Sequence, residues 1–236
     1  MDVKIAPELL FEKHKPLLDQ ALTVCHGRTC WSPFPEMPKK YPDWQTAEAA
    51  GKARFESSLN QPFVIDQPGQ IGWLGDEVSP YTRQPLGITY PQADLDQLFA
   101  AAEQAMNAGW AVATPEARLG VLMEVIDQLY GDLFTLVYAV FHTAGQSFNM
   151  SYAGSGVNAL DRGIEALAYA YEAMRMVPRT ATWQRQFGPD TIRLQKTYRL
   201  VPRGVAVCFT CASFPTWNAF PSMMASLATG NAVIVK

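Results

Sequence analysis

The sequence carries little charge and no long apolar run. Only 17% of its 236 residues are charged, and the formal net charge is -3. With no basic surplus to neutralise phosphates, we expect neither nucleic acid nor an anionic membrane as a partner. No apolar stretch approaches the roughly 20 residues that span a bilayer. The first residues, with Asp2, Glu8 and Glu12, lack the basic flank and apolar run of a secretory signal. These absences predict a cytoplasmic protein that acts on a small molecule.

Cysteine is also scarce. The four cysteines, Cys25, Cys30, Cys208 and Cys211, are spaced as C-x4-C and C-x2-C, a pattern that some zinc sites use. In a cytosolic protein they would stay reduced. Cys208 and Cys211 lie in the apolar run GVAVCFTC, and residues three apart in an extended strand point to opposite faces. We therefore interpret these two as small buried hydrophobic residues and assign no metal site.

The amino-terminal part is rich in proline and aromatic residues. Apolar spacing over residues 7–26, interrupted at Pro16 and stopped at Gly27, predicts two short helices or one kinked helix. Nine of the 17 prolines fall within residues 31–91, which favours extended and turn conformations around one short helix at 44–59. The stretch has too many aromatic residues for a solvated spacer, so we expect it to wrap against the body. These aromatic residues are Trp31, Phe34, Tyr41, Trp44, Phe63, Trp73, Tyr81 and Tyr90.

Four helices are predicted after residue 91. Asp94 is a good N-cap for the first, and Thr114 followed by a proline and a glutamate marks the start of the second. The third begins at Asp132, and the fourth precedes Pro178. A lone histidine at a helix end is usually structural, so His142 receives no catalytic role. The apolar positions expected in the four helices are Leu95, Leu98, Phe99, Ala102 and Met106; Leu122, Val125, Ile126 and Leu129; Val137, Val140 and Phe141; and Leu160, Ile164, Leu167, Tyr171 and Met174.

Two kinds of strand follow. In residues 191–201, TIRLQKTYRLV, apolar and polar side chains alternate, as in a strand with one face in water. GVAVCFT and AVIV are apolar throughout, which predicts parallel strands covered on both faces. The helix between them, ended by Gly230, completes a β-α-β unit and must begin near Pro221 or kink there. Its expected core positions are Met223, Met224, Leu227 and Ala228.

Ligands of open parallel sheets bind at the carboxyl ends of the strands. Residues 210–213 leave the first apolar strand, and Lys236 follows the second. A lysine there can bind a ribose hydroxyl or a phosphate of a dinucleotide, but its position alone equally fits a solvated strand end. The turn G-x-G-x-x-G is absent after the first strand, and AGSG at 153–156 follows a helix signal instead. An ordinary dinucleotide fingerprint is therefore missing.

Residues 201–236, VPRGVAVCFTCASFPTWNAFPSMMASLATGNAVIVK, resemble the start of the cofactor domain of aldehyde dehydrogenases. In that family P-x-G-V leads into a buried strand, followed by F-P, a helix and G-N-x-V-x-x-K, and the match runs without a gap from Gly204 to Lys236. The helices over 94–130 resemble the family's early helices. RTCWSPFPEMP and FPTWNAFPSMMASLATGNAVIVK resemble the branch associated with phenylacetate degradation, which extends the resemblance over essentially the whole chain.

The resemblance implies an α/β fold of aldehyde dehydrogenase type. In this fold N-terminal helices lead into the first β-α-β of a Rossmann-type parallel sheet, which this sequence leaves incomplete. Residues 1–93 would form a family-specific extension and 94–236 an incomplete NAD(P)-binding domain, with the catalytic domain absent. Residues 191–201 would be the oligomerisation strand of a homo-oligomer.

The resemblance also implies roles for individual residues. The family's cofactor-binding lysine falls on Lys236, and its oxyanion asparagine falls on Ser213, a departure from the family pattern. A serine hydroxyl can donate to an oxyanion, although it is shorter than asparagine and rotates more freely. Asn218 is out of register by five residues and is interpreted as a helix-start residue. The positions that would line the nicotinamide end of the cofactor are Thr210, Cys211 and Ala212.

Aldehyde oxidation in the family proceeds by thiolate attack, hydride transfer to the nicotinamide and release of the thioester by water. The cysteine nucleophile and glutamate base would lie beyond Lys236, so this piece alone is expected to be inactive. The complete protein would be an NAD- or NADP-dependent dehydrogenase. Its substrate would be an aldehyde of phenylacetate catabolism derived from a coenzyme A thioester. The alternative is a truncated, non-catalytic protein or an interaction module.

Overall fold

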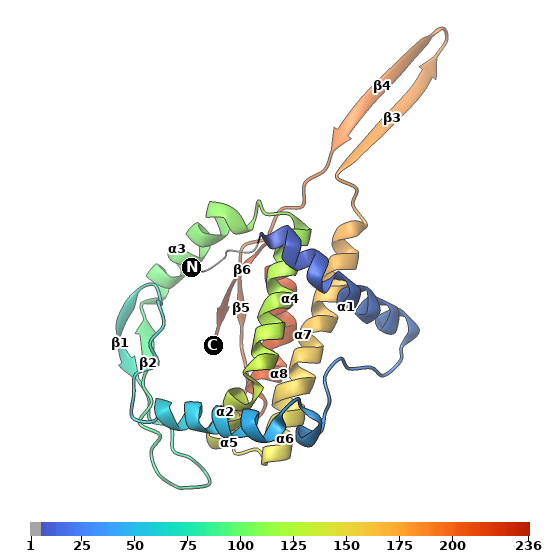
Figure 1. The fold of residues 1–236 in the computed structure, drawn as a ribbon. Coiled ribbons are helices and arrows are strands. Elements are labelled where there is room, and N and C mark those ends of the chain that lie inside the picture. Colours follow the sequence, from blue (N-terminus) through green and yellow to red (C-terminus); the bar gives the residue numbers. More distant parts are fainter. Residues whose placement is uncertain (1–5) are drawn as a thin grey trace.

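The computed structural model describes residues 6–236 (Figure 1). Asp2, used above in the argument against a secretory signal, lies outside the described residues. No helix in the described part of the chain is long and apolar enough to cross a membrane. The chain forms a helical body, a small parallel β-α-β unit, and a long hairpin that projects away from both (Figure 1).

Four long helices share the main core. They are α1 (Pro7–Gly27), α4 (Pro115–Gly131), α7 (Asn158–Arg175) and α8 (Pro215–Ala228). All five apolar positions predicted for α7 are buried, which confirms that face. Burying one such leucine or isoleucine side chain stabilises the fold by roughly 1.5–3 kcal/mol.

The predicted buried face of α4 is right except at one position. Leu122 and Ile126 are buried and Leu129 packs against the core, but Val125 is 38% exposed. The buried stripe is centred on Leu119, Leu122 and Ile126. At 3.6 residues per turn, Val125 lies about 100° from the centre of that stripe.

Two helix crossings depend on glycine. A Cβ on Gly120 of α4 would lie 2.5 Å from the main-chain nitrogen of Phe11 in α1. A Cβ on Gly51 of α2 (Trp44–Ser58) would lie 2.5 Å from the Cβ of Phe134. These helices approach closely because the glycines have no side chain.

The predicted helix starts are confirmed. The Asp94 side chain accepts from the main-chain N–H of Gln97 at 2.9 Å, and the Thr114 hydroxyl accepts from that of Ala117 at 3.1 Å. In α1 the structure has one helix rather than two, with Pro16 inside it. The remaining helices are α3 (Leu95–Ala105), α5 (Leu133–Ala144), α6 (Phe148–Tyr152), the 3-10 turn η1 (Pro38–Lys40), and the π-helical turns η2 (Met106–Trp110) and η3 (Ala153–Val157). The sequence did not predict α6 or η3.

His142, near the end of α5, is held by its neighbours. Its Nδ1 lies 2.8 Å from the Ser79 hydroxyl, and its ring stacks on Phe55 with centroids 5.0 Å apart. Burial lowers the pKa of His142. These contacts link α5 to α2 and to the segment of residues 75–89.

The proline-rich segment packs against the body in its first part and again near its end, where Tyr81 stacks on Phe141 of α5 and Tyr90 packs against a small core cluster. Trp31, Phe34 and Tyr41 pack against the main core, as predicted. Phe63 and Trp73 are 51% and 44% exposed, so the prediction is wrong for them. Their part of the chain forms an arm beside the helical body (Figure 1). This arm contains an unpredicted antiparallel pair of strands, β1 (Gln70–Leu74) and β2 (Tyr90–Ala93).

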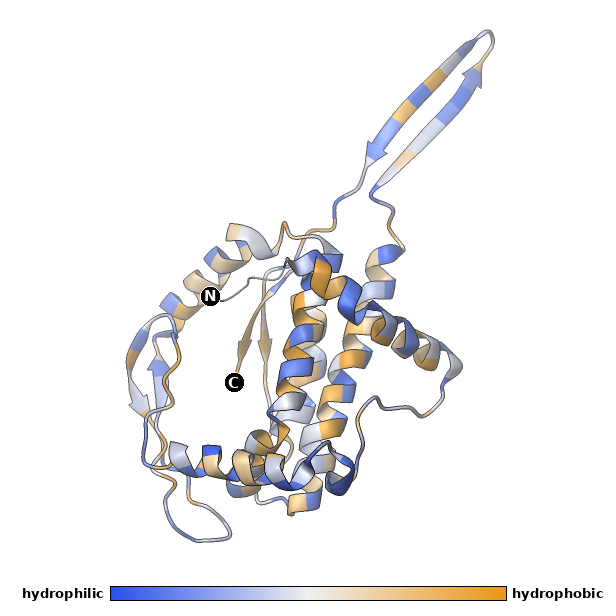
Figure 2. Cartoon of the chain, viewed as in Figure 1, coloured by the Kyte–Doolittle hydropathy of each residue, from blue (hydrophilic) through white to orange (hydrophobic). Residues whose placement is uncertain are grey.

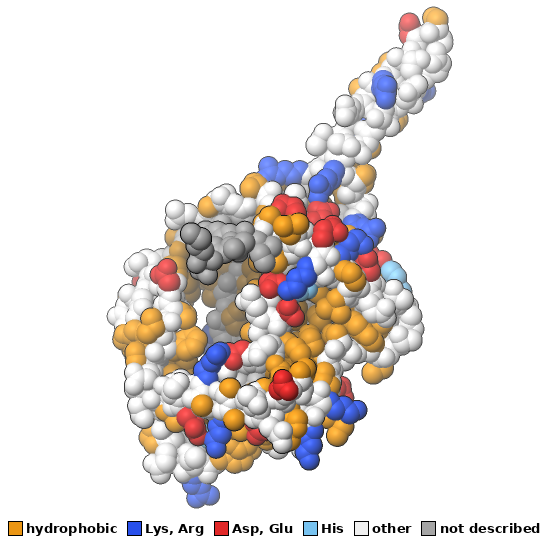
Figure 3. Space-filling model, in the orientation of Figure 1, with side chains coloured by type: hydrophobic (Ala, Val, Ile, Leu, Met, Phe, Trp, Pro, Cys, Tyr) orange, Lys and Arg blue, Asp and Glu red, His pale blue; other side chains and the backbone are white. Residues whose placement is uncertain are grey.

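The projecting hairpin consists of β3 (Thr180–Phe187) and β4 (Asp190–Thr197), paired antiparallel. It extends well beyond the body (Figures 1 and 3). The strand predicted over 191–201 is present as β4, but it ends at Thr197. Its partner β3 was not predicted, because TATWQRQF has only a weak apolar alternation.

The β-α-β unit is confirmed. Strands β5 (Val205–Cys208) and β6 (Ala232–Val235) pair in parallel through α8 (Figure 1), and both are strongly hydrophobic (Figure 2). Within α8, Met224 and Ala228 are buried, Met223 and Leu227 pack against the core, and Pro221 lies inside the helix.

The prediction that these strands are covered on both faces is wrong for the described residues. Val207 is 41% exposed and Val235 is 47% exposed. Apolar composition favours burial, but burial needs an element on each face. Among the described elements, α8 and α3 supply most of the contacts to these strands, and they leave part of the surface open.

Candidate functional site

The carboxyl ends of β5 and β6 lie side by side, as predicted. The main-chain N–H of Thr210 donates to the carbonyl of Lys236 at 2.8 Å, and that of Lys236 donates to Cys208 at 2.9 Å. The Thr210 hydroxyl donates to the same Lys236 carbonyl at 3.0 Å. Strand pairing therefore continues past β5 and brings Thr210 next to Lys236.

The side chains at this edge differ in which groups they leave free for a ligand. The Thr210 hydroxyl hydrogen is donated to the Lys236 carbonyl, so it is not free to bond to a ligand. Thr210 would line a ligand site without donating a hydrogen bond to the ligand. The Lys236 side chain is exposed, and none of the ion pairs among the described residues includes it. A free ammonium at the carboxyl edge of a parallel sheet fits a phosphate or a ribose hydroxyl of a dinucleotide.

Cys211 lies in the loop between β5 and α8. Its Sγ donates to Asn218 Oδ1 at 2.8 Å, accepts from the N–H of Phe214 at 3.3 Å, and lies 3.4 Å from the Ser213 hydroxyl. The hydrogen bond with Ser213 and those with main-chain N–H groups lower the pKa of the Cys211 thiol. The interpretation as a buried hydrophobic residue is correct for Cys208, which is 5% exposed, and wrong for Cys211, because the strand ends at Cys208.

Ser213 and Asn218 are both close to this loop. Ser213 is exposed, and Ala212 precedes it at the same edge. Asn218 lies in the first turn of α8, as predicted, but it also accepts the Cys211 thiol hydrogen. The structure therefore brings Thr210, Cys211, Ser213 and Lys236 to one end of the β-α-β unit. Their contacts to a cofactor stay a prediction.

Sequence reasoning missed the residues beneath the loop. Gln146 Nε2 donates to the main-chain carbonyl of Ser213, and the buried Ser155 hydroxyl donates to Gln146 Oε1 at 3.0 Å. The hydroxyl of Thr216 donates to the carbonyl of Ser155 at 2.5 Å. Ser213 and Gln146 are 67 positions apart, so no local pattern could connect them.

The G-N of the GNAVIVK motif has a structural role. Gly230 follows α8 with φ of +91°, a conformation that favours glycine. Asn231 Oδ1 accepts from the main-chain N–H groups of Arg203 at 2.8 Å and Gly204 at 3.1 Å, while its Nδ2 donates to Ser226 at 3.1 Å. One side chain thus ties the start of β5 to the turn before β6.

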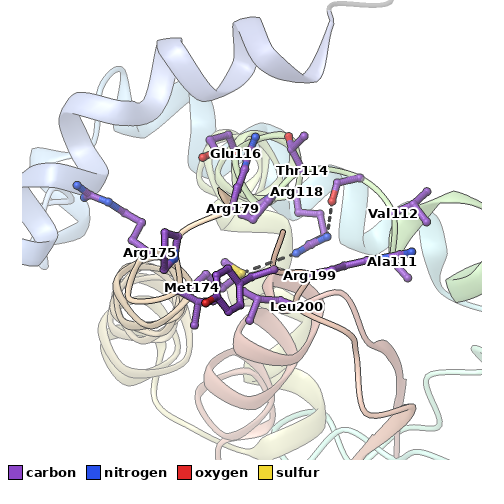
Figure 4. A pocket seen from close by; sticks show the side chains of 15 residues that line it. Ala111, Val112, Thr114, Glu116, Arg118, Met174, Arg175, Arg179, Arg199 and Leu200 are labelled. Atoms are coloured by element: carbon purple, nitrogen blue, oxygen red, sulfur yellow. Dashed lines mark hydrogen bonds and ion pairs between the residues drawn. The ribbon is translucent and has the colours of Figure 1, made fainter. Parts of the chain in front are cut away.

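A cavity of about 500 Å³ lies elsewhere, at the base of the β3–β4 hairpin (Figure 4). Arg118, 4% exposed, lies in its wall and donates to the carbonyls of Ala228 at 2.8 Å and Ala113 at 2.5 Å. Arg179 is paired with Glu116 across the same cavity. Arg175 and Arg199 also line this cavity, and neither takes part in an ion pair among the described residues. The strand edge remains the stronger candidate site, because the predicted site residues meet there.

A cluster of His14, Glu124 and Asp127 has the side-chain types of a metal site. The Lys13 ammonium, however, lies 2.6 Å from Glu124 and 3.0 Å from Asp127, and His14 Nε2 lies 2.7 Å from Glu124. Hydrogen bonds from Lys13 and His14 lower the pKa of Glu124 to about 2. The cluster therefore forms an ion-pair network that joins α1 to α4.

A model of the aldehyde dehydrogenase family matches residues 75–236. An NAD-dependent aldehyde dehydrogenase from Burkholderia multivorans is 42% identical to the chain and superposes with a TM-score of 0.90. The chain belongs to the aldehyde dehydrogenase family. The match covers 96% of this chain and 40% of the Burkholderia protein, so the chain spans less than half the length of that relative.

More distant aldehyde dehydrogenase structures share the fold. A 1-pyrroline-5-carboxylate dehydrogenase from Thermus with bound NAD is 14% identical, with a TM-score of 0.60 over 88% of this chain and 40% of its own. Betaine aldehyde dehydrogenase from Staphylococcus aureus in complex with NAD+ is 20% identical, with a TM-score of 0.55 over 77% and 35%. No curated protein matches the chain. The predicted fold class, helices leading into a β-α-β of aldehyde dehydrogenase type, is confirmed.

Proposed function

We propose that the complete protein is an NAD-dependent aldehyde dehydrogenase, to which this chain contributes the start of the cofactor domain, within the predicted division into residues 1–93 and 94–236. The observation that carries the proposal is the 42% identity, over 96% of the chain, to an NAD-dependent aldehyde dehydrogenase. Lys236 suits a 2′-phosphate as well as a ribose hydroxyl, so NADP is the second cofactor to test.

The residues at the strand edge have two proposed roles, cofactor binding and stabilisation of an oxyanion. The Lys236 ammonium binds a ribose hydroxyl or a phosphate, and the main chain at Thr210, Cys211 and Ala212 lines the nicotinamide end. A bound dinucleotide supplies a hydride acceptor. The Ser213 hydroxyl donates to the negative oxygen that develops when a nucleophile adds to the aldehyde. These roles agree with the free ammonium of Lys236 and the exposed position of Ser213.

The substrate proposal is an aldehyde of phenylacetate catabolism derived from a coenzyme A thioester, in the cytoplasm. It rests on the phrases RTCWSPFPEMP and FPTWNAFPSMMASLATGNAVIVK. We also propose a homo-oligomer in which the hairpin of β3 and β4 contacts another copy. The exposed apolar side chains of this hairpin, which include Trp183, Ile192 and Leu194, support that assignment.

Turnover by the complete protein tests the proposal. Aromatic and coenzyme A-linked aldehydes are offered with NAD or NADP, and the reduced nicotinamide is measured by absorbance.

Loss of one oxyanion donor typically costs about a hundredfold to a thousandfold in kcat, so Ser213→Ala should lower kcat by that factor. Ser57→Ala, an exposed serine on α2, is the matched control and should leave kcat unchanged. A complete protein that oxidises no aldehyde with either cofactor would support the non-catalytic alternative instead.

A further inference from the structure

The loop that carries Ser213 rests on η3 and on the turn that precedes α6. Residues 211–214 leave β5 with no regular structure of their own, and Ser213 itself is exposed. Its main-chain carbonyl is fixed by Gln146, a side chain only 9% exposed. Four further contacts hold Gln146 and the chain that follows Ser213.

Gln146 is itself oriented from two sides. The Ser155 hydroxyl, fully buried, donates to its Oε1 at 3.0 Å. An amide whose oxygen accepts a hydrogen bond must direct its NH2 group the other way, here toward Ser213. The Tyr81 hydroxyl donates to the Gln146 main-chain carbonyl at 2.7 Å. The side chain and the backbone of Gln146 are therefore both fixed by hydrogen bonds that do not involve the loop.

Residues of η3 also contact the chain that follows Ser213. The Thr216 hydroxyl, in the first turn of α8, donates to the carbonyl of Ser155. A Cβ on Gly154 would lie 2.9 Å from Cε1 of Phe214, so the Phe214 ring packs directly on the glycine. Gly154 and Ser155 belong to η3, a π-helical turn, and such turns often occur at functional sites. The turn thus contacts Phe214 at the end of the loop and Thr216 in the first turn of α8.

We propose that Gln146, oriented by Ser155, is a positioning residue that holds the Ser213 hydroxyl in place for aldehyde oxidation. The proposal rests on the function proposed above. Gln146 acts through the Ser213 carbonyl and touches no reacting atom. Because a misplacement of about 1 Å can cost about a hundredfold in rate, the loss of this contact should lower kcat more than it changes KM.

The first test is Gln146→Glu in the complete protein. The carboxylate keeps the shape of the side chain and can still accept from Ser155, but it cannot donate and it repels the Ser213 carbonyl. We expect kcat to fall about tenfold to a hundredfold, with KM changed less than threefold. Ser155→Ala, which leaves Gln146 unoriented, should give a smaller fall in kcat. The matched control is Gln104→Glu, the same change at an exposed position of α3, which should leave kcat unchanged.

A double variant separates positioning from general damage. If Gln146 acts only through the Ser213 hydroxyl, then Gln146→Glu should lower kcat no further in a Ser213→Ala background. An equal loss in both backgrounds would overturn the proposal, and so would an unchanged kcat in the Gln146→Glu single variant.

Hydrogen exchange tests the positioning without any turnover. In Gln146→Glu the amides of residues 211–214 should exchange about tenfold faster, while those in the middle of α8 keep their rates. Unchanged exchange at 211–214 would overturn the positioning role whether or not the protein oxidises aldehydes. Faster exchange in a protein without turnover would leave the positioning intact and refute the proposed function.

Discussion

Asp161 is a nearly buried carboxylate with few hydrogen-bond partners. It is 9% exposed, and its Oδ1 accepts from the Ser32 hydroxyl at 3.0 Å. The same hydroxyl also lies 2.9 Å from the carbonyl of Phe34, and one hydroxyl hydrogen cannot serve both acceptors fully. Burial raises the pKa of Asp161 to about 6, and the bond from Ser32 only partly offsets that.

Replacing Asp161 with asparagine should stabilise the protein near neutral pH. The folded pKa lies above the ordinary 3.8, so the folded state favours the neutral acid, and that contribution is lost as pH rises from about 4 to about 6. Asp161→Asn keeps the acceptor for Ser32 without the charge. Its free energy of unfolding should exceed that of the unchanged protein by about 1–3 kcal/mol at about pH 7.5, and by nothing at about pH 4.

Urea unfolding at the two pH values measures this difference. Asp66→Asn, the same change at an exposed position, is the reference for loss of the charge itself. A difference between Asp161→Asn and the unchanged protein that is equal at both pH values would show that burial does not disfavour the Asp161 charge.

At the scale of elements, local signals were predictable and long-range partners were not. The caps at Asp94 and Thr114 bond to groups three residues away, so the sequence contains the whole interaction. The hydrogen bond from Gln146 to the Ser213 carbonyl joins segments 67 residues apart. No sequence pattern around Gln146 indicates that it contacts this loop. The parallel strands were predicted from their apolar runs, but β3 was missed because its own sequence alternates only weakly and its pairing with β4 is what defines it as a strand.

The crossing of α1 and α4 gives a prediction that helix propensity alone would get wrong. Alanine normally stabilises a helix relative to glycine by up to about 1 kcal/mol. At Gly120 the added Cβ would lie 2.5 Å from Phe11 N and 2.6 Å from the Pro7 carbonyl, both main-chain atoms that cannot rotate away. Gly120→Ala should therefore lower the free energy of unfolding by about 1–3 kcal/mol.

Gly131, the last residue of the same helix, is the control. No atom lies within 4 Å of a Cβ placed there, so Gly131→Ala should be neutral or stabilising. Thermal unfolding of both variants decides the matter. If Gly120→Ala were as stable as Gly131→Ala, the close approach of the two helices would be wrong.

At the scale of the whole molecule, the β3–β4 hairpin projects away from the body (Figure 1), and its two strands pair only with each other among the described residues. Its register places Trp183 opposite Leu194 and Arg185 opposite Ile192, and since alternate residues share a face, Phe187 belongs to the same side. The other face is polar throughout: Thr180, Thr182, Gln184, Gln186, Thr191, Arg193, Gln195 and Thr197. An isolated two-stranded hairpin is at best marginally stable in water. The first face also carries Arg185, Asp190 and Lys196, but all four exposed large apolar side chains of the two strands lie on it, and this favours a partner surface.

The proposed homo-oligomer predicts that the two faces of the hairpin respond differently to charge. Leu194, 49% exposed in the single chain, would be buried against another copy, so Leu194→Lys should convert the complete protein to smaller species. Gln195→Lys introduces the same charge on the adjacent polar face and should leave the assembly intact. Light scattering of both variants at equal concentration measures the masses. If both variants keep the mass of the unchanged protein, the apolar face does not carry the contact; if both dissociate, the assembly depends on the charge of the hairpin and not on its face.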